Sequence, residues 1–338
     1  MKAIQLNGFG DVSNFSLTHL DTPVIKNDEV LIQIKASAFN PIDYQMRLGL
    51  RESRLMRSPI LGRELSGIVQ QVGPDVIGFK PGDEVIALAG SRGSNGSYAE
   101  LMALNYQMIG RKPRHISFEE AAAIPSSGLT AWHSFTRMKA EVSDSIFING
   151  AAGGVGRFLI KLLKANGVSN IVATAGSEQS IVALQSLGLG DGQIINYNQP
   201  GLKDLLITAN HGKRFDYAVD LVGGTITETA ADVLKMNGNY VDVTFLGTSV
   251  AREILFDKGA NILNIAAYAF AIENNLSWYG DTLNHLAQLI ETHKIDAPTV
   301  NVIGNLSVET VQEAHRLMEA NRVYGKKLVM TVAVDEEV

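Results

Sequence analysis

A cluster of residues with little or no side chain lies at positions 150–156, inside the stretch IFINGAAGGVG. The apolar run before it predicts a buried strand, and the segment GRFLIKLLKANG after it predicts a helix that ends at Gly167. A glycine turn between a strand and a helix is typical of a dinucleotide site, where the N–H groups of Gly154, Val155 and Gly156 would point at phosphates. The alternative is a tightly packed turn that holds no ligand.

Strands alternate with helices through the central part of the chain. After the glycine turn, the segments NIVATAG, QIINY, FDYAVDLVGG, GNYVDVTFLG and NILNIAAYAF predict further strands. This alternation predicts βαβ units and a parallel sheet. The first 120 residues instead contain short strands with alternating apolar and polar residues, such as EVLIQIKASAFN, which predict a β-rich, barrel-like module. The chain is thus expected to be an α/β protein with two domains.

The strand NIVATAG, the next one after the glycine turn, bears on the choice of cofactor. NAD sites usually place a carboxylate at its end to bind the ribose 2′-hydroxyl. Here residues 174–176 are neutral, and Ser177 follows with a hydroxyl that can bind a 2′-phosphate. The sequence therefore favours NADP(H). Two features weigh against this choice, because Glu178 can face the ribose and Ser180 stands where a lysine would help.

Composition excludes several classes of protein. Apolar residues make up 46% and charged residues 19% of the 338 residues, as in a globular protein. The net charge of −6 argues against nucleic acid and an anionic membrane as partners. The chain contains no cysteine, which excludes disulfides, iron–sulfur clusters and a cysteine nucleophile. The first residues, MKAIQLNGFG, have no apolar signal core, so we expect a cytoplasmic protein.

Seven stretches resemble, in order, the motifs of one enzyme family. They are AFNPIDYQMRLG, PILGRELSGIVQQVGPDVIGFKPGDEV, GSYAEL, ISFEEAAAIPSSGLTAW, NGAAGGVG, IINY and GKKLVM. By these motifs the chain is identified as a member of the zinc-free medium-chain dehydrogenases/reductases, in the quinone oxidoreductase (zeta-crystallin-like) branch. That branch typically has A-x-G-G-V-G at the glycine turn, which accounts for Ala151.

The resemblance implies a fold and an assembly. It implies a GroES-like catalytic domain at residues 1–123, a doubly wound Rossmann domain for NADPH at residues 124–275, and a C-terminal segment, residues 276–338, that returns to the catalytic domain. Members are often dimers through the edge of the Rossmann sheet, so a homodimer is expected, with NILNIAAYAF as an apolar edge strand.

The resemblance also bears on metal binding. Zinc-dependent members have a cysteine where Asn40 stands and a histidine where Arg63 stands. An arginine cannot ligate a metal, and a catalytic zinc needs three protein ligands. The seven histidines are scattered without an H-x-x-x-H pair. We therefore expect no metal site.

Functional residues follow by resemblance, position by position. Asn40 and Tyr44 match the pair that flanks the nicotinamide and the substrate, and we take them as the catalytic candidates. The cofactor would be bound by Asn40, Thr130, Ala152, Gly153, Gly154, Val155, Gly156, Ser177, Tyr197 and Phe245.

Each of the three polar candidates near the substrate has a structural alternative. Asn40 precedes a proline and can be a turn residue that bonds its own backbone. Tyr44 can be packed with its hydroxyl on a carbonyl, and Thr130 can be a hydroxyl at the start of a helix. Two neighbours of the candidates fit structural roles better than chemical ones, Asp43 in the local turn and His133 as a core or surface histidine.

The implied reaction is hydride transfer from NADPH to a small quinone or α,β-unsaturated carbonyl, without a metal. Such acceptors are electron-poor, and a hydrogen bond from Asn40, from the Tyr44 hydroxyl or from ordered water could stabilise the developing negative charge. One alternative is an enoyl-thioester reductase of the same superfamily, for which the arginines of LRESRLMRSP would form a carrier-binding patch. A second is an NADPH-binding protein without turnover.

Overall fold

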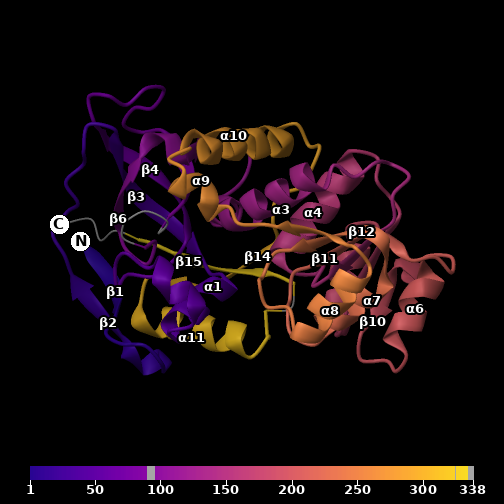
Figure 1. Ribbon diagram of the computed structural model, residues 1–338. Coiled ribbons are helices and arrows are strands. Elements are labelled where there is room, and N and C mark those ends of the chain that lie inside the picture. Colours follow the sequence, from indigo (N-terminus) through magenta and orange to yellow (C-terminus); the bar gives the residue numbers. More distant parts are fainter. Residues whose placement is uncertain (90–95, 324, 334–338) are drawn as a thin grey trace. The chain divides into compact units, whose positions relative to one another are not determined.

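The chain forms two compact units in the computed structural model, which describes residues 1–89, 96–323 and 325–333 (Figure 1). The β-rich unit comprises residues 1–129 together with the chain from residue 268 onward, and the parallel-sheet unit comprises residues 130–267. The first boundary lies inside α3 (Pro125–Met138), between Leu129 and Thr130, six residues after the expected limit at residue 123. The second lies before α9 (Tyr268–Ile272), a few residues ahead of the expected limit at residue 275.

The β-rich unit is built around β3 (Glu29–Ala38), the longest strand of a seven-stranded sheet. One edge of β3 pairs with β4 (Glu64–Val72), and the other pairs first with β6 (Leu101–Asn105) and then with β15 (Lys327–Thr331). The C-terminal segment therefore completes this sheet. The other elements of the unit are β1 (Lys2–Leu6), β2 (Phe15–His19), β5 (Glu84–Leu88), β7 (Ile109–Arg111), β14 (Val300–Asn305), α1 (Pro41–Arg47), α2 (Phe118–Ala122), α10 (Ser277–Glu291) and α11 (Val308–Glu319).

The parallel-sheet unit has the strand order β10-β9-β8-β11-β12-β13, with every neighbouring pair parallel. In chain order this is 3-2-1-4-5-6, the order of a Rossmann fold, so the predicted fold class is confirmed. The strands are β8 (Ile146–Asn149), β9 (Ile171–Ala175), β10 (Ile194–Asn196), β11 (Phe215–Asp220), β12 (Leu234–Asp242) and β13 (Asn261–Asn264).

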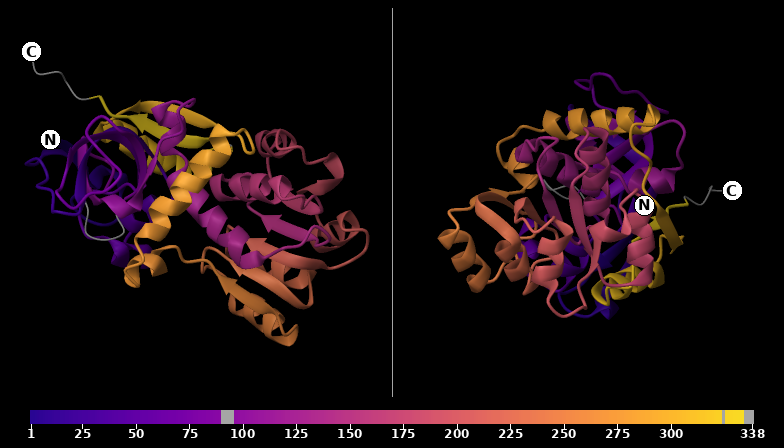
Figure 2. Two further views of the ribbon diagram at one scale, coloured as in Figure 1. Left: turned by 90° about the horizontal axis from the view of Figure 1, so that it is seen from above. Right: turned by 90° about the vertical axis from the view of Figure 1, so that its right-hand side faces the viewer.

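Helices cover both faces of this parallel sheet (Figures 1 and 2). On one face, Phe147 of β8 shares an apolar core with Leu206, Ala230 and Leu255, which come from three successive helices. These are α6 (Leu202–Ala209), α7 (Ile226–Val233) and α8 (Ser249–Asp257), and the other helices of the unit are α4 (Gly154–Ala165) and α5 (Glu178–Gln185). Within the described parts of the chain, no helix is both long enough and apolar enough to cross a membrane.

The last predicted strand of this unit was too long. β13 ends at Asn264, and the second half of NILNIAAYAF lies in and just before α9. An apolar run of this length fits a strand or a buried helix equally well by periodicity, and its alanines favour the helix.

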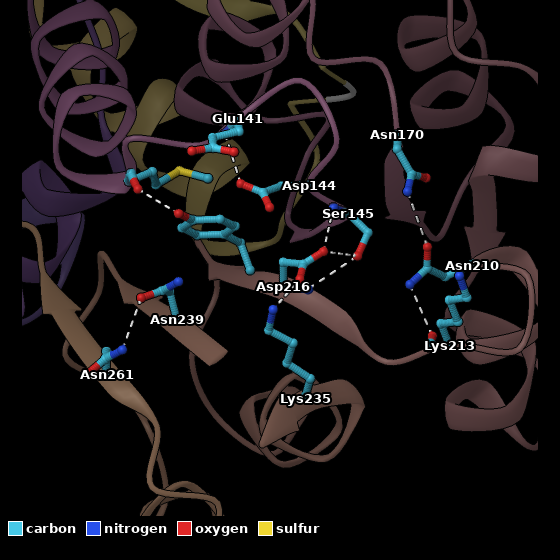
Figure 3. A network of polar contacts seen from close by, with 12 residues as sticks. Glu141, Asp144, Ser145, Asn170, Asn210, Lys213, Asp216, Lys235, Asn239 and Asn261 are labelled. Carbon is cyan, nitrogen blue, oxygen red and sulfur yellow. Dashed lines mark hydrogen bonds and ion pairs between the residues drawn. The ribbon is translucent and has the colours of Figure 1, made fainter. Parts of the chain in front are cut away.

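The amino ends of the strands are closed by polar contacts (Figure 3). The carboxylate of Asp216, near the start of β11, accepts hydrogen bonds from the Ser145 N–H at 2.8 Å and the Ser145 hydroxyl at 2.7 Å. The Lys235 ammonium, near the start of β12, forms an ion pair with the same carboxylate. The starts of three adjacent strands are thus joined. The glycine turn lies at the opposite end of the sheet, where the strands have their carboxyl ends.

Candidate functional site

The predicted site residues form two sets, one in each unit. In the parallel-sheet unit, the glycine turn follows β8 at its carboxyl end and leads into α4. β8 lies between β9 and β11, where the strand order reverses direction, and ligands of doubly wound sheets bind at this point. The structure therefore places the turn where a dinucleotide would bind.

The backbone around α4 explains why small residues are needed. A Cβ on Gly156 would lie 2.5 Å from the carbonyl oxygen of Ala151, so a side chain there would push the helix off the strand. The first hydrogen bond of the helix runs from Arg157 N–H to the Gly153 carbonyl. The N–H groups of residues 154–156 consequently have no acceptor within the helix. Gly153 and Gly154 are exposed and Val155 is partly exposed, whereas Gly156 is buried, so the start of the turn is open to a pyrophosphate.

Ser177 and Tyr197 lie next to each other at the ends of β9 and β10. A Cβ on Gly176 would lie 2.1 Å from the Tyr197 ring, so the ring covers this glycine directly. The Ser177 hydroxyl caps α5 by accepting the Ser180 N–H at 3.2 Å, and the two serine hydroxyls are 2.9 Å apart. The loop thus offers two hydroxyls and a helix N-terminus to an anion, beside a tyrosine that is 43% exposed.

Phe245 lies on the loop that follows β12, at the same carboxyl edge of the sheet. Its φ of +58° is unusual for an aromatic residue. The conformation is held by a hydrogen bond of 2.8 Å from the Phe245 N–H to the Asp242 carboxylate, while the ring is 66% exposed. The predicted cofactor contacts in the glycine turn and at Ser177, Tyr197 and Phe245 therefore all lie at the carboxyl ends of strands of the same sheet.

A buried carboxylate that the sequence analysis did not single out ties these strand ends together. Asp220, the last residue of β11, is 0% exposed. One of its oxygens accepts the Asn149 side-chain N–H at 3.1 Å and the N–H groups of Val222 and Gly223, and the other accepts the Tyr240 hydroxyl at 2.9 Å. In the sequence, Asp220 could have been noticed as a carboxylate at the end of an otherwise apolar predicted strand.

The second set of predicted residues lies in the β-rich unit, at the start of α1. Asn40 is the residue before this helix and is 5% exposed. The alternative interpretation required the Asn40 side chain to bond its own backbone, and the side chain makes no such capping bond. Instead the amide nitrogen donates to Glu64 Oε1 at 2.9 Å, and the amide oxygen accepts from Lys327 Nζ. Glu64 and Lys327 belong to the quoted motifs, but the sequence alone gave no reason to assign them a role.

Asp43 and Arg63 complete this polar cluster. The Asp43 carboxylate accepts the Asn40 N–H at 2.8 Å, which confirms its expected role in the local turn, and its other oxygen has no hydrogen-bond partner among the described residues. Burial raises the pKa of Asp43 to about 7, against the opposing effects of the Asn40 N–H and the Arg63 guanidinium. Asp43 therefore changes charge near neutral pH.

Tyr44, Thr130 and His133 differ in their surroundings. Tyr44 is half-buried against the apolar core, and burial followed by the charge of Glu319 raises the pKa of its hydroxyl. Thr130 lies within α3 and not at its start, so it is not a helix-capping hydroxyl. Burial, and then Arg137, lowers the pKa of His133 to about 4, so this histidine is neutral at physiological pH, as expected of a core residue.

The acidic and histidine side chains of the described residues do not form a metal site. In residues 1–89, 96–323 and 325–333, no group of three or more His, Cys, Asp or Glu side chains is arranged to hold a metal ion. At the positions where zinc-dependent enzymes have ligands, Asn40 and Arg63 are engaged in the polar cluster instead.

Comparisons with known proteins agree with this geometry. Residues 26–114 match the alcohol dehydrogenase GroES-like domain, and residues 163–329 match the family described as zinc-binding dehydrogenase. Over 338 residues the chain is 32% identical to the 2-methylene-furan-3-one reductase of Solanum lycopersicum, covering 97% of this chain and 79% of the relative.

Two further proteins extend the comparison. The chain is 29% identical to the chloroplastic NADPH-dependent alkenal/one oxidoreductase of Arabidopsis thaliana, covering 98% of this chain and 80% of the relative. It is 28% identical to the quinone oxidoreductase of Coxiella burnetii, whose solved structure matches with a TM-score of 0.84 over 98% of this chain and 99% of that one.

Proposed function

The chain belongs to the quinone oxidoreductase branch of the medium-chain dehydrogenases/reductases, and on this basis we propose that it transfers a hydride from NADPH to a quinone or an α,β-unsaturated carbonyl. The observation that carries the proposal is the glycine turn, whose N–H groups at residues 154–156 have no acceptor within the helix and which lies where the strand order of a Rossmann sheet reverses. The named activities of the relatives point to the same chemistry.

The residues of the parallel-sheet unit fit NADPH. The N–H groups of residues 154–156 would hold the pyrophosphate, and Gly153 leaves room for it, because a Cβ there would meet a single atom within 4 Å. The hydroxyls of Ser177 and Ser180 would bind the 2′-phosphate at the N-terminus of α5. No carboxylate ends β9, which favours a phosphate there, and the nearest carboxylate in the chain is that of Glu178 in the first turn of α5. When bound, NADPH supplies the hydride, and the protein provides position and electrostatics.

The acceptor follows from the electrostatics of the β-rich unit. Negative charge develops on the oxygen of a quinone or enone as the hydride arrives at carbon, and a hydrogen-bond donor stabilises it. Asn40 offers an amide N–H and Tyr44 a phenolic O–H for this purpose. Because an amide donor is weaker than a metal ion as an electrophile, it suits acceptors that are already electron-poor.

The proposal is tested with the purified protein in two steps. Calorimetric titration with NADPH and with NADH measures cofactor binding, and the absorbance of NADPH at 340 nm then follows turnover with a panel of quinones, enones and acyl thioesters. We expect tighter binding of NADPH than of NADH, and turnover with at least one quinone or enone. Absence of nucleotide binding would refute the proposal.

The same experiment separates the two alternatives. Turnover restricted to acyl thioesters would identify an enoyl-thioester reductase, for which Arg51, Arg54 and Arg57 are exposed around the short helix Arg51–Leu55. Binding of NADPH without turnover of any acceptor would identify a cofactor-binding protein.

A homodimer formed through β13 is part of the proposal. β13 is an edge strand of the parallel sheet, and an edge strand presents unpaired backbone groups to a second copy. Ile262 on this strand is 44% exposed. Light scattering should give about twice the chain mass of 36.5 kDa, and Ile262→Lys should shift it toward the monomer. Val302→Lys, a similarly exposed position on β14, is the matched control. A monomeric wild-type protein would contradict the dimer.

A further inference from the structure

The side chain of Asn40 is held from both sides by buried charged groups. Its oxygen accepts from the Lys327 ammonium, and its nitrogen donates to the Glu64 carboxylate at 2.9 Å. The ammonium and the carboxylate are themselves 2.7 Å apart, so the three side chains form a closed triangle. The Glu64 side chain is 0% exposed and the Lys327 side chain 11% exposed.

The triangle is anchored in four separate segments of the β-rich unit. Asn40 precedes α1, Glu64 begins β4 and Lys327 begins β15. The second Glu64 oxygen accepts the N–H of Ser126 at 2.7 Å, and the ammonium lies 3.3 Å from the Ser127 hydroxyl, both at the start of α3. With so many fixed partners, neither charged side chain is free to reorient.

Stability alone is a weak reason for such an arrangement. Burying an ammonium and a carboxylate costs most of what their attraction returns, so a buried ion pair is often no more stable than apolar residues of the same volume. The ion pair does, however, fix the orientation of the Asn40 amide. An amide can present either its oxygen or its N–H group, but a lysine only donates and an ionised glutamate only accepts.

We propose that Lys327, together with Glu64, is a positioning residue that fixes the Asn40 amide with its second N–H available to the substrate oxygen. Lys327 holds the amide oxygen, and one N–H is used by Glu64, which leaves the other N–H without a hydrogen-bond partner among residues 1–89, 96–323 and 325–333. Donation into the amide oxygen also polarises the N–H bonds and makes them stronger donors. This inference rests on the proposed function, because it assigns the donor for the developing negative charge.

The test compares variants of Lys327 with a neighbouring lysine. Lys327→Met keeps a long side chain but removes the hydrogen-bond donor, whereas Lys327→Arg keeps a donor. Lys326→Met changes the exposed lysine that precedes Lys327 and is the control. We expect Lys327→Met to lower kcat by about 10- to 100-fold with the Kd for NADPH unchanged, the size expected for a lost hydrogen bond to a charged group. Lys327→Arg should recover part of the loss, and Lys326→Met should behave as the wild type.

A double-mutant cycle with Asn40→Ala decides whether Lys327 acts through Asn40. If it does, Lys327→Met has no further effect on kcat in the Asn40→Ala background. Equal losses in both backgrounds would overturn the inference, as would an unchanged kcat in Lys327→Met. If Lys327→Met does not fold, Lys327→Gln replaces it; its neutral amide is a weaker donor than an ammonium, so we expect a smaller loss of kcat that is again absent in the Asn40→Ala background.

A readout without turnover separates this inference from the proposed function. In NMR spectra of the protein without ligand, the Asn40 side-chain N–H that donates to Glu64 should be protected from hydrogen exchange relative to the second N–H, and Lys327→Met should reduce this protection because the amide oxygen is no longer held in place. Protected signals in a wild-type protein that reduces no acceptor would leave the positioning intact and the proposed function wrong. Signals equally protected in Lys327→Met would refute the positioning whatever the activity.

Discussion

The replacement of Gly156 by alanine tests whether the glycine turn is shaped for a ligand. The new Cβ would lie 2.5, 2.6 and 2.7 Å from the oxygen, Cα and carbonyl carbon of Ala151. The first of these distances is 0.9 Å shorter than the 3.4 Å at which ordinary contact begins. All three atoms are backbone atoms, so no rotamer change relieves the overlap, and the N-terminus of α4 must move away from β8.

The magnitude follows from two effects of that movement. Overpacking of this kind costs about 1–3 kcal/mol of folding free energy. The N–H groups of residues 154–156 move with the helix, and each weakened hydrogen bond to a charged phosphate costs about 1.5–3 kcal/mol of binding free energy. We therefore expect the Kd for NADPH to rise about 10- to 150-fold in Gly156→Ala. Urea unfolding measures the first effect and calorimetric titration the second.

Two matched variants separate packing from binding. Gly153→Ala meets a single carbonyl oxygen at 3.3 Å, so it should retain stability but weaken NADPH binding by filling the space for the pyrophosphate. Gly192→Ala, with no atom within 4 Å, should change neither. Binding of NADPH by Gly156→Ala or by Gly153→Ala with the wild-type Kd would show that the turn does not hold the pyrophosphate.

Three further variants probe the polar groups of both units. The pKa of Asp43 is raised from 3.8 to about 7, so the folded protein keeps this proton while the unfolded chain loses it, and stability should fall by about 4 kcal/mol as the pH rises from 4 to 7. Asp43→Asn should remove this fall, and urea unfolding at pH 4.5 and 7.5 that shows the same difference in both proteins would contradict it. Ser177→Ala should weaken NADPH binding by about tenfold and leave NADH unchanged in titrations, because it removes a hydroxyl from the 2′-phosphate site; an equal loss for both nucleotides would place the phosphate elsewhere. Tyr240→Phe leaves one oxygen of Asp220 without its partner and should lower the free energy of unfolding by about 1–3 kcal/mol, and an unchanged urea midpoint would show that this bond contributes nothing.

The fold was largely predictable because its signals are local. The glycine turn and the helix GRFLIKLLKANG each depend on residues close together in the chain, and the structure has the turn after β8 and α4 at Gly154–Ala165. The end of β13 was not predictable, because a short alanine-rich apolar run carries no decisive periodicity.

The site was predictable only where a motif marks it. The turn and the loop at Ser177 follow directly from strand ends, so sequence position fixes their place in the sheet. The bond between Asn40 and Lys327 joins residues that are 287 positions apart, and no pattern near either residue indicates the other. Asp220 is similar, since its partner Asn149 lies on a strand that is adjacent in the sheet but distant in the chain.

The interrupted course of the β-rich unit has a consequence for how the protein is made. Val329 of β15 pairs with Ala38 of β3, although 291 residues separate them. At about 5–20 residues per second, a ribosome needs roughly 15–60 s to deliver that partner. Throughout this interval the backbone of residues 36–38 lies open along one side, where a nascent chain is vulnerable to pairing with the wrong strand. We therefore expect that newly synthesised chains depend on chaperones until the last strand emerges, and that the parallel-sheet unit, which is continuous in sequence, folds first.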